Sequence, residues 1–101
     1  MIDIHWSNKV FDDILLIKEH LRRLGSEVLA ERFVDKVFEK VEILKTFPNL
    51  GKIVAEFNRK DIRELIYKQY RIVYRIKTFD KITILTIQYS SKPMSYESIF
   101  E

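Results

Sequence analysis

Residues Tyr70–Lys77, YRIVYRIK, alternate between two kinds of side chain along the whole stretch. Successive side chains of a β-strand point to opposite faces, so one face receives aromatic and aliphatic residues and the other receives mainly cations. The apolar set is Tyr70, Ile72, Tyr74 and Ile76, and the opposite set is Arg71, Val73, Arg75 and Lys77. The alternation predicts a strand with one face in a core and one solvated, basic face.

Outward from this stretch, the sequence predicts a strand on each side. Asp61–Lys68, DIRELIYK, precedes it with only Gln69 between them, and Lys81–Ser90, KITILTIQYS, follows after a short turn. Links this short permit only antiparallel neighbours, because a parallel return needs a crossover. The three strands are therefore expected to form an antiparallel meander.

The first half of the chain has helical periodicity after a short strand, Ile2–Trp6. Ser7 and Ser26 are the predicted N-caps of two helices, and Gly25 ends the first helix so that the pair doubles back as a hairpin. The second helix is expected to end near Thr46, before Pro48 and Gly51. The apolar positions that the helical period assigns to the core are Val10, Phe11, Ile14, Leu15, Ile17, Leu21 and Leu24, then Ala30, Phe33, Val34, Val37, Val41 and Leu44.

The predicted order of elements is β-α-α-β-β-β, which indicates an α+β fold. We expect one domain over residues 1–101, with the helical hairpin packed on one face of a twisted antiparallel sheet. The tail, SKPMSYESIFE at residues 91–101, contains Pro93 and few apolar anchors. It is expected to be a loosely held turn of helix or an extended end.

Composition argues against a disulfide-linked, a secreted or a membrane-spanning protein. The chain has no cysteine, and the N-terminal residues lack the basic and apolar pattern of a signal peptide. No stretch has the length of a membrane span, so we expect a cytoplasmic protein with no membrane contact. Its two histidines, His5 and His20, lie on different predicted elements, and the two glycines punctuate turns. No metal site and no cofactor are therefore expected.

Positive charge is concentrated in the second half of the chain. Counting Lys and Arg against Asp and Glu, residues 1–50 have a net charge of −1 and residues 51–101 a net charge of +4. The hypothesis is a basic binding face for an anionic partner, formed by Arg63, Lys68, Arg71, Arg75 and Lys77. The alternative is that Arg63, Arg71 and Arg75 pair with Glu64, Asp61 or Asp80 on a solvated face.

The arrangement of motifs resembles the RelE/ParE superfamily of toxins from type II toxin-antitoxin systems, also known for plasmid stabilisation. The resemblance covers nearly the full length. It includes the helix FDDILLIKEHLRRLG, the helix AERFVDKVFEKVEILKTFPNLGK with its Leu-x-x-x-Pro-x-x-Gly ending, and IRELIYKQYRIVYRI. The long helical hairpin is more similar to ParE than to RelE. The resemblance implies a growth-arresting toxin held inactive by a cognate antitoxin, whose acidic segment would wrap the basic sheet and the hairpin.

Two mechanisms are implied by this resemblance. ParE-like members poison DNA gyrase, which is the leading expectation. RelE-like members are metal-independent endoribonucleases that cleave mRNA on the ribosome. In that case Arg71 matches the phosphate-stabilising arginine, and Arg63, Tyr89 and Lys92 complete the candidate catalytic set. A third hypothesis is a decayed member that retains only partner binding, so whether the chain is an enzyme stays open at this point.

Overall fold

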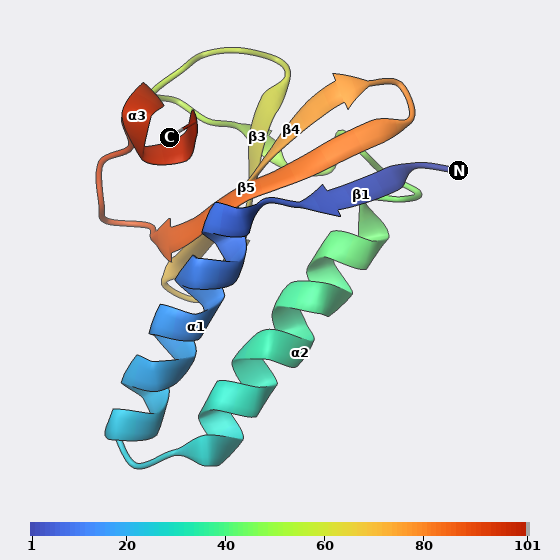
Figure 1. Ribbon diagram of the computed structural model, residues 1–101. Helices are drawn as coiled ribbons and strands as arrows, with labels where there is room; N and C mark the ends of the chain where they lie inside the picture. Colours follow the sequence, from blue (N-terminus) through green and yellow to red (C-terminus); the bar gives the residue numbers. More distant parts are fainter. Residues whose placement is uncertain (101) are drawn as a thin grey trace.

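The computed structural model describes residues 1–100, apart from the side chain of Ser98, and contains three helices and one five-stranded sheet in that range (Figure 1). The elements in chain order are β1 (Asp3–Trp6), α1 (Asn8–Arg23), α2 (Glu27–Ile43), β2 (Lys52–Ile53), β3 (Ile62–Tyr67), β4 (Tyr70–Thr78), β5 (Lys81–Tyr89) and α3 (Tyr96–Phe100). The order of strands across the sheet is β1-β5-β4-β3-β2. None of the helices in residues 1–100 is both long enough and apolar enough to cross a membrane.

The predicted fold class is confirmed, and the structure adds two strand pairings. Strands β3, β4 and β5 are antiparallel neighbours, as the short links require, and β2 pairs antiparallel with β3. β1, whose partner the sequence did not assign, lies parallel to β5 and makes the sheet mixed. The connection from β1 to β5 is long enough for this because it contains the whole hairpin and meander. β2 is a strand of two residues that the periodicity did not predict.

Local capping explains where the helices begin and turn. The Ser7 hydroxyl accepts from the N–H of Val10 at 3.1 Å, and the Ser26 hydroxyl accepts from the N–H of Leu29 at 3.0 Å. Gly25 has a φ of +85°, a left-handed conformation that a residue with a Cβ adopts at a cost. The two predicted N-caps and the glycine between the helices are therefore confirmed.

The main core lies between the helical hairpin and the sheet. Tyr70, Ile72 and Tyr74 of β4 are buried there, as the alternation predicts. Three of the core positions predicted for the first helix are instead exposed: 48% of Phe11 and 61% of Leu15 in α1, and 66% of Leu24 at its C-cap, are accessible. The apolar stripe of α1 is wider than the surface that the sheet can cover, so its outer part faces solvent.

A second core covers much of the opposite face of the sheet, so the prediction of a solvated face is wrong for Arg71 and Val73 and holds only toward Lys77. Val73 of β4 is fully buried, as are Val54 before β3 and Ile62 within β3. Met94 and Ile99 of the C-terminal segment pack into the same cluster. The turn of helix expected in the tail is present as α3, but the tail is not loosely held, because Met94 and Ile99 anchor it in this core. Glu101 lies outside the described residues.

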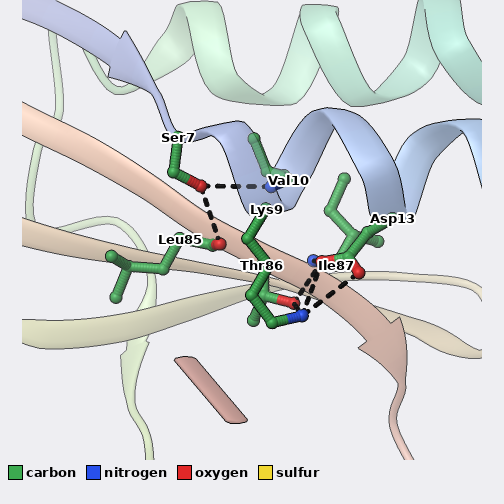
Figure 2. Close-up of polar contacts among 7 residues, drawn as sticks. All are labelled: Ser7, Lys9, Val10, Asp13, Leu85, Thr86 and Ile87. Carbon is green, nitrogen blue, oxygen red and sulfur yellow. Dashed lines mark hydrogen bonds and ion pairs between the residues drawn. The ribbon is translucent and has the colours of Figure 1, made fainter. Parts of the chain in front are cut away.

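Beyond the end of β1, side chains at the start of the first helix form hydrogen bonds with the edge of β5 (Figure 2). The Ser7 hydroxyl donates to the carbonyl of Leu85 at 2.9 Å. Six residues further along, the Asp13 carboxylate accepts from the N–H of Ile87 at 3.2 Å and from the hydroxyl of Thr86. Side chains of α1 thus supply the hydrogen bonds that a longer β1 would have made, and they fix the hairpin against the sheet.

A tyrosine hydroxyl joins β4 to the loop after α2. The fully buried Tyr74 accepts from the N–H of Gly51 at 2.9 Å and donates to the carbonyl of Pro48 at 2.8 Å. A Cβ on Gly51 would lie 2.7 Å from both the Tyr74 ring and the carbonyl oxygen of Glu64. The Pro-x-x-Gly ending is therefore explained by close packing against this tyrosine.

Substitution Tyr74→Phe should lower the free energy of unfolding by about 1–3 kcal/mol, because it leaves a buried N–H without its acceptor. Urea denaturation followed by circular dichroism measures this difference. The control is Tyr96→Phe. Tyr96 is 57% exposed, so we expect this substitution to change the free energy of unfolding by no more than about 0.5 kcal/mol. Equal effects of the two substitutions would contradict the structural role of the Tyr74 hydroxyl.

Candidate functional site

The arginine that the sequence singles out, Arg71, is buried on the face of the sheet opposite the hairpin. Only 6% of this residue is exposed. Its Nη1 and Nη2 donate to Glu56 at 3.1 and 2.6 Å, and its Nη1 also donates to Glu64 at 3.1 Å. Glu64 is cross-strand on β3, and Glu56 comes from the loop after β2. The guanidinium is therefore enclosed by two carboxylates from different segments.

The same cluster holds the C-terminal segment in place. The Nη2 of Arg71 donates to the backbone carbonyl of Lys92 at 2.7 Å, and the Glu56 carboxylate accepts from the N–H of Met94 at 3.1 Å. These two bonds position the chain just before α3. Arg71 thus connects β4 to β3, to the loop after β2 and to the tail.

The electrostatics of this cluster favour the ionised states of Glu56 and Arg71. The hydrogen bonds from Arg71 lower the pKa of Glu56 from its ordinary 4.5 to about 2. In turn, hydrogen bonding to Glu56 raises the pKa of Arg71. Lys52 lies 3.6 Å from the second carboxylate, Glu64. With its charge balanced in this way, Arg71 offers little attraction for an anion from outside, because opposite charges within 4 Å compensate most of its field.

A shallow depression of about 420 Å³ opens beside the cluster. It is lined by Lys52, Ile53, Ala55, Glu56, Glu64, Ile66, Arg71 and Ser90. Two cations, two carboxylates and two isoleucines make its chemistry mixed. Such a surface suits contact with a polypeptide better than capture of a phosphate, which needs an excess of donors.

The five predicted cations of the basic face do not converge. Arg71 is buried in ion pairs, and Arg75 pairs with Asp61 at 3.2 Å. Arg63 pairs in register with Tyr74 on the hairpin side of the sheet, where its guanidinium donates to the carbonyl of Gly51 at 3.0 Å. The proposed alternative, pairing with Glu64 and Asp61, is thus correct for Arg71 and Arg75.

The two remaining lysines of the set lie at opposite ends of β4. Lys68 is in the turn before β4, with its ammonium 5.6 Å from the centre of the Tyr67 ring. Lys77 is exposed near the other end of the strand. Partner binding by the five cations stays a prediction, but they do not form one continuous row.

The candidate catalytic set is divided between the two faces of the sheet. Tyr89 pairs in register with Tyr70, and their rings are 5.3 Å apart on the hairpin side, the side that also carries Arg63. Arg71 points to the opposite side. Lys92 touches Arg71 through its backbone carbonyl. No group of three His, Cys, Asp or Glu side chains suited to a metal ion occurs within residues 1–100.

Glu56 is the member of the cluster that sequence reasoning missed. It lies between predicted elements, in a loop with no periodic signal, and is 15 positions away from the arginine it binds. The only signal was indirect. A buried strand that carries an arginine must find carboxylates nearby, so each unassigned Glu or Asp of the adjoining loops was a candidate.

The chain is similar to known proteins both in sequence pattern and in fold. Residues 4–94 match the family model described as the ParE toxin of type II toxin-antitoxin system, parDE. Among solved structures, the chain is similar to one described as a chromosomal ParDE TA system from P. aeruginosa, with 24% sequence identity and a TM-score of 0.72. That match covers 88% of this chain and 96% of the other, and it shows likeness of fold. No curated protein matches the sequence.

Substitution Glu56→Gln should make stability less dependent on pH in acid. A carboxylate whose folded pKa is depressed stabilises the fold above its unfolded pKa, and that contribution is lost as the pH falls from about 4.5 to about 2. Without the carboxylate, stability at pH 7 should fall and its slope in this acid range should flatten. Urea titrations between pH 2 and pH 7 measure both effects.

The matched control for this measurement is Glu31→Gln, at an exposed position of α2. This variant should reproduce the acid slope of the unsubstituted chain. If Glu56→Gln keeps the same slope as the control, the ion pair with Arg71 contributes nothing to stability.

Proposed function

The chain belongs to the ParE toxin family of type II toxin-antitoxin systems, and we propose that it arrests growth by binding and poisoning DNA gyrase. In this proposal the target is a protein surface, and no bond is made or broken by residues of this chain. A cognate antitoxin would hold the toxin inactive. The observation that carries the proposal is the state of Arg71, which is buried and balanced by two carboxylates.

A metal-independent ribonuclease makes different demands on the same residues. It needs cations directed at the phosphate and a base near the 2′-hydroxyl, all on one surface. Here Arg63 and Tyr89 belong to one face of the sheet and Arg71 to the other. This division favours binding over RNA cleavage as the mechanism.

An antitoxin partner is supported by the similar ParDE structure and by the surface of the hairpin. That structure is described as a ParDE TA system, and the matching family model is that of the ParE toxin in a toxin-antitoxin system. Exposed apolar side chains of α1 and α2 include Phe11, Leu15, Leu16, Val28 and Phe38. Phe11 and Phe38 both lie beside the Trp6 ring, at ring-centre distances of 6.4 and 4.7 Å, and apolar side chains gathered on a surface mark sites of protein contact. The hairpin is thus a better candidate for the antitoxin segment than the sheet cations, most of which already have partners.

Expression of the chain without its antitoxin should slow growth and induce the DNA-damage response while leaving messages intact. Mapping of transcript ends and a reporter of DNA damage measure the two responses in the same culture. New cuts in translated messages would instead support the ribosome-dependent nuclease. Unchanged growth would support a decayed member that retains only partner binding.

The variant Tyr89→Phe separates binding from cleavage with little risk to the fold. Tyr89 is partly exposed, and phenylalanine keeps its ring against Tyr70 while removing the hydroxyl. Under the gyrase proposal growth arrest should be unchanged. A nuclease that uses this hydroxyl would lose activity by about a hundredfold or more.

A further inference from the structure

Strand β1 leaves backbone groups unpaired along one edge of the sheet. The N–H groups of Asp3 and Ser7 donate at 2.8 and 3.1 Å to carbonyl oxygens of the β4–β5 turn and of β5. Backbone groups of successive residues point to alternate sides of a strand, so those of Ile2, Ile4 and Trp6 point away from the sheet. They form an open edge that a further strand can join.

We infer that β1 pairs with β1 of a second copy of this chain, antiparallel and centred on Ile4. In this register Ile4 lies opposite Ile4 of the second copy, and Ile2 lies opposite Trp6 of the second copy. These are the residues whose N–H and C=O groups point outward, so each facing pair exchanges two hydrogen bonds. The two sheets then become one continuous sheet, related by a twofold axis.

The pairing of polar side chains across the two strands selects this register, because an imidazole can donate a hydrogen bond to a carboxylate. Asp3 and His5 lie on the face of β1 opposite the isoleucines, and the twofold axis at Ile4 brings Asp3 of each copy opposite His5 of the other. They are non-hydrogen-bonded pairs, whose side chains lie closest across antiparallel strands. A register centred on Asp3 would oppose two carboxylates, and one centred on His5 would oppose two imidazoles.

Strands β5 and β4 place two lysines near the Asp3 and His5 side chains. Lys81 of β5 is in register with Asp3, so each aspartate would lie between a lysine of its own copy and a histidine of the other. Lys77, also positive, lines the same depression as His5. Each Asp3 carboxylate therefore offsets part of the positive charge of Lys81 beside it on β5.

The other face of β1 offers space for apolar side chains of the second copy. A depression of about 280 Å³ runs along the open edge between β1 and α2. Its lining includes Trp6, Phe38 and Val41, and Glu42 and Lys45 also border it. The Trp6 and Phe38 rings are 4.7 Å apart. The lining is mixed, and the strand of the second copy would direct its own isoleucines toward the rings of Trp6 and Phe38 within it.

The other edge of the sheet, formed by β2, does not offer a strand long enough for such pairing. β2 has only two residues, too few for a stable added strand. β1 has four residues, with neither a proline nor a register shift in its pairing. An interface of this size is small, so we expect a weak dimer with a dissociation constant in the micromolar range. The pairing does not depend on the target proposed above.

The test is sedimentation velocity of the full chain over a concentration series, with His5→Asp and the swapped double variant Asp3→His/His5→Asp. The single variant His5→Asp places a carboxylate opposite Asp3 of the other copy, at both symmetry-related pairs. It should weaken dimerisation about tenfold or more. The swap exchanges the members of each pair and should restore the dimer to within about threefold of the original. The control is His20→Asp, which makes the same change at the exposed histidine of α1 and should have no effect.

Circular dichroism checks that each variant is folded, so that loss of the dimer is not loss of the fold. A monomer at all concentrations up to the solubility limit would overturn the proposal, as would a dimer that His5→Asp does not weaken. Failure of the swap to restore association would reject the register. Association of β1 only with an antitoxin strand would assign the edge to a different occupant and would also overturn the proposal.

Discussion

The guanidinium of Arg71 and its two carboxylates hold together the face of the sheet that the hairpin does not cover. Removing a charge from water is costly unless a partner and hydrogen bonds replace the solvent. Glu56 and Glu64 supply the partner charge, and the carbonyl of Lys92 takes a further N–H. Because each contact comes from a different segment, one side chain determines where a loop, two strands and the tail meet. The second core, which includes Val73, lies on the same face of the sheet as this cluster.

This arrangement has a direct consequence for function. A sheet face that is covered by α3 and neutralised by internal ion pairs does not present a row of cations to a nucleic acid. The surfaces that remain accessible are apolar or mixed, on the outside of the hairpin and along the edge of β1. The chain belongs to the ParE toxin family, and these accessible surfaces are the ones that the proposed contact with a target protein would use.

Much of the fold follows from local rules, and so could be predicted. Ser7, Ser26 and Gly25 mark the helix ends because capping and left-handed conformation depend on a few neighbouring residues. The alternation of β4 correctly placed Tyr70 and Tyr74 in the main core. The predictions failed where a second layer intervened. A period of two distinguishes the two faces of a strand, but it does not show whether the second face meets solvent or another segment.

The amino-acid sequence by itself determined the order of elements, the helical hairpin, the antiparallel meander and the residues that face the hairpin, since these depend on short-range periodicity and turn chemistry. Only the tertiary structure decided the parallel partner of β1, the burial of Arg71 and the docking of Met94 and Ile99. Those features join segments that are far apart in the chain. Their energies depend on which groups are brought together away from water, which no local pattern records.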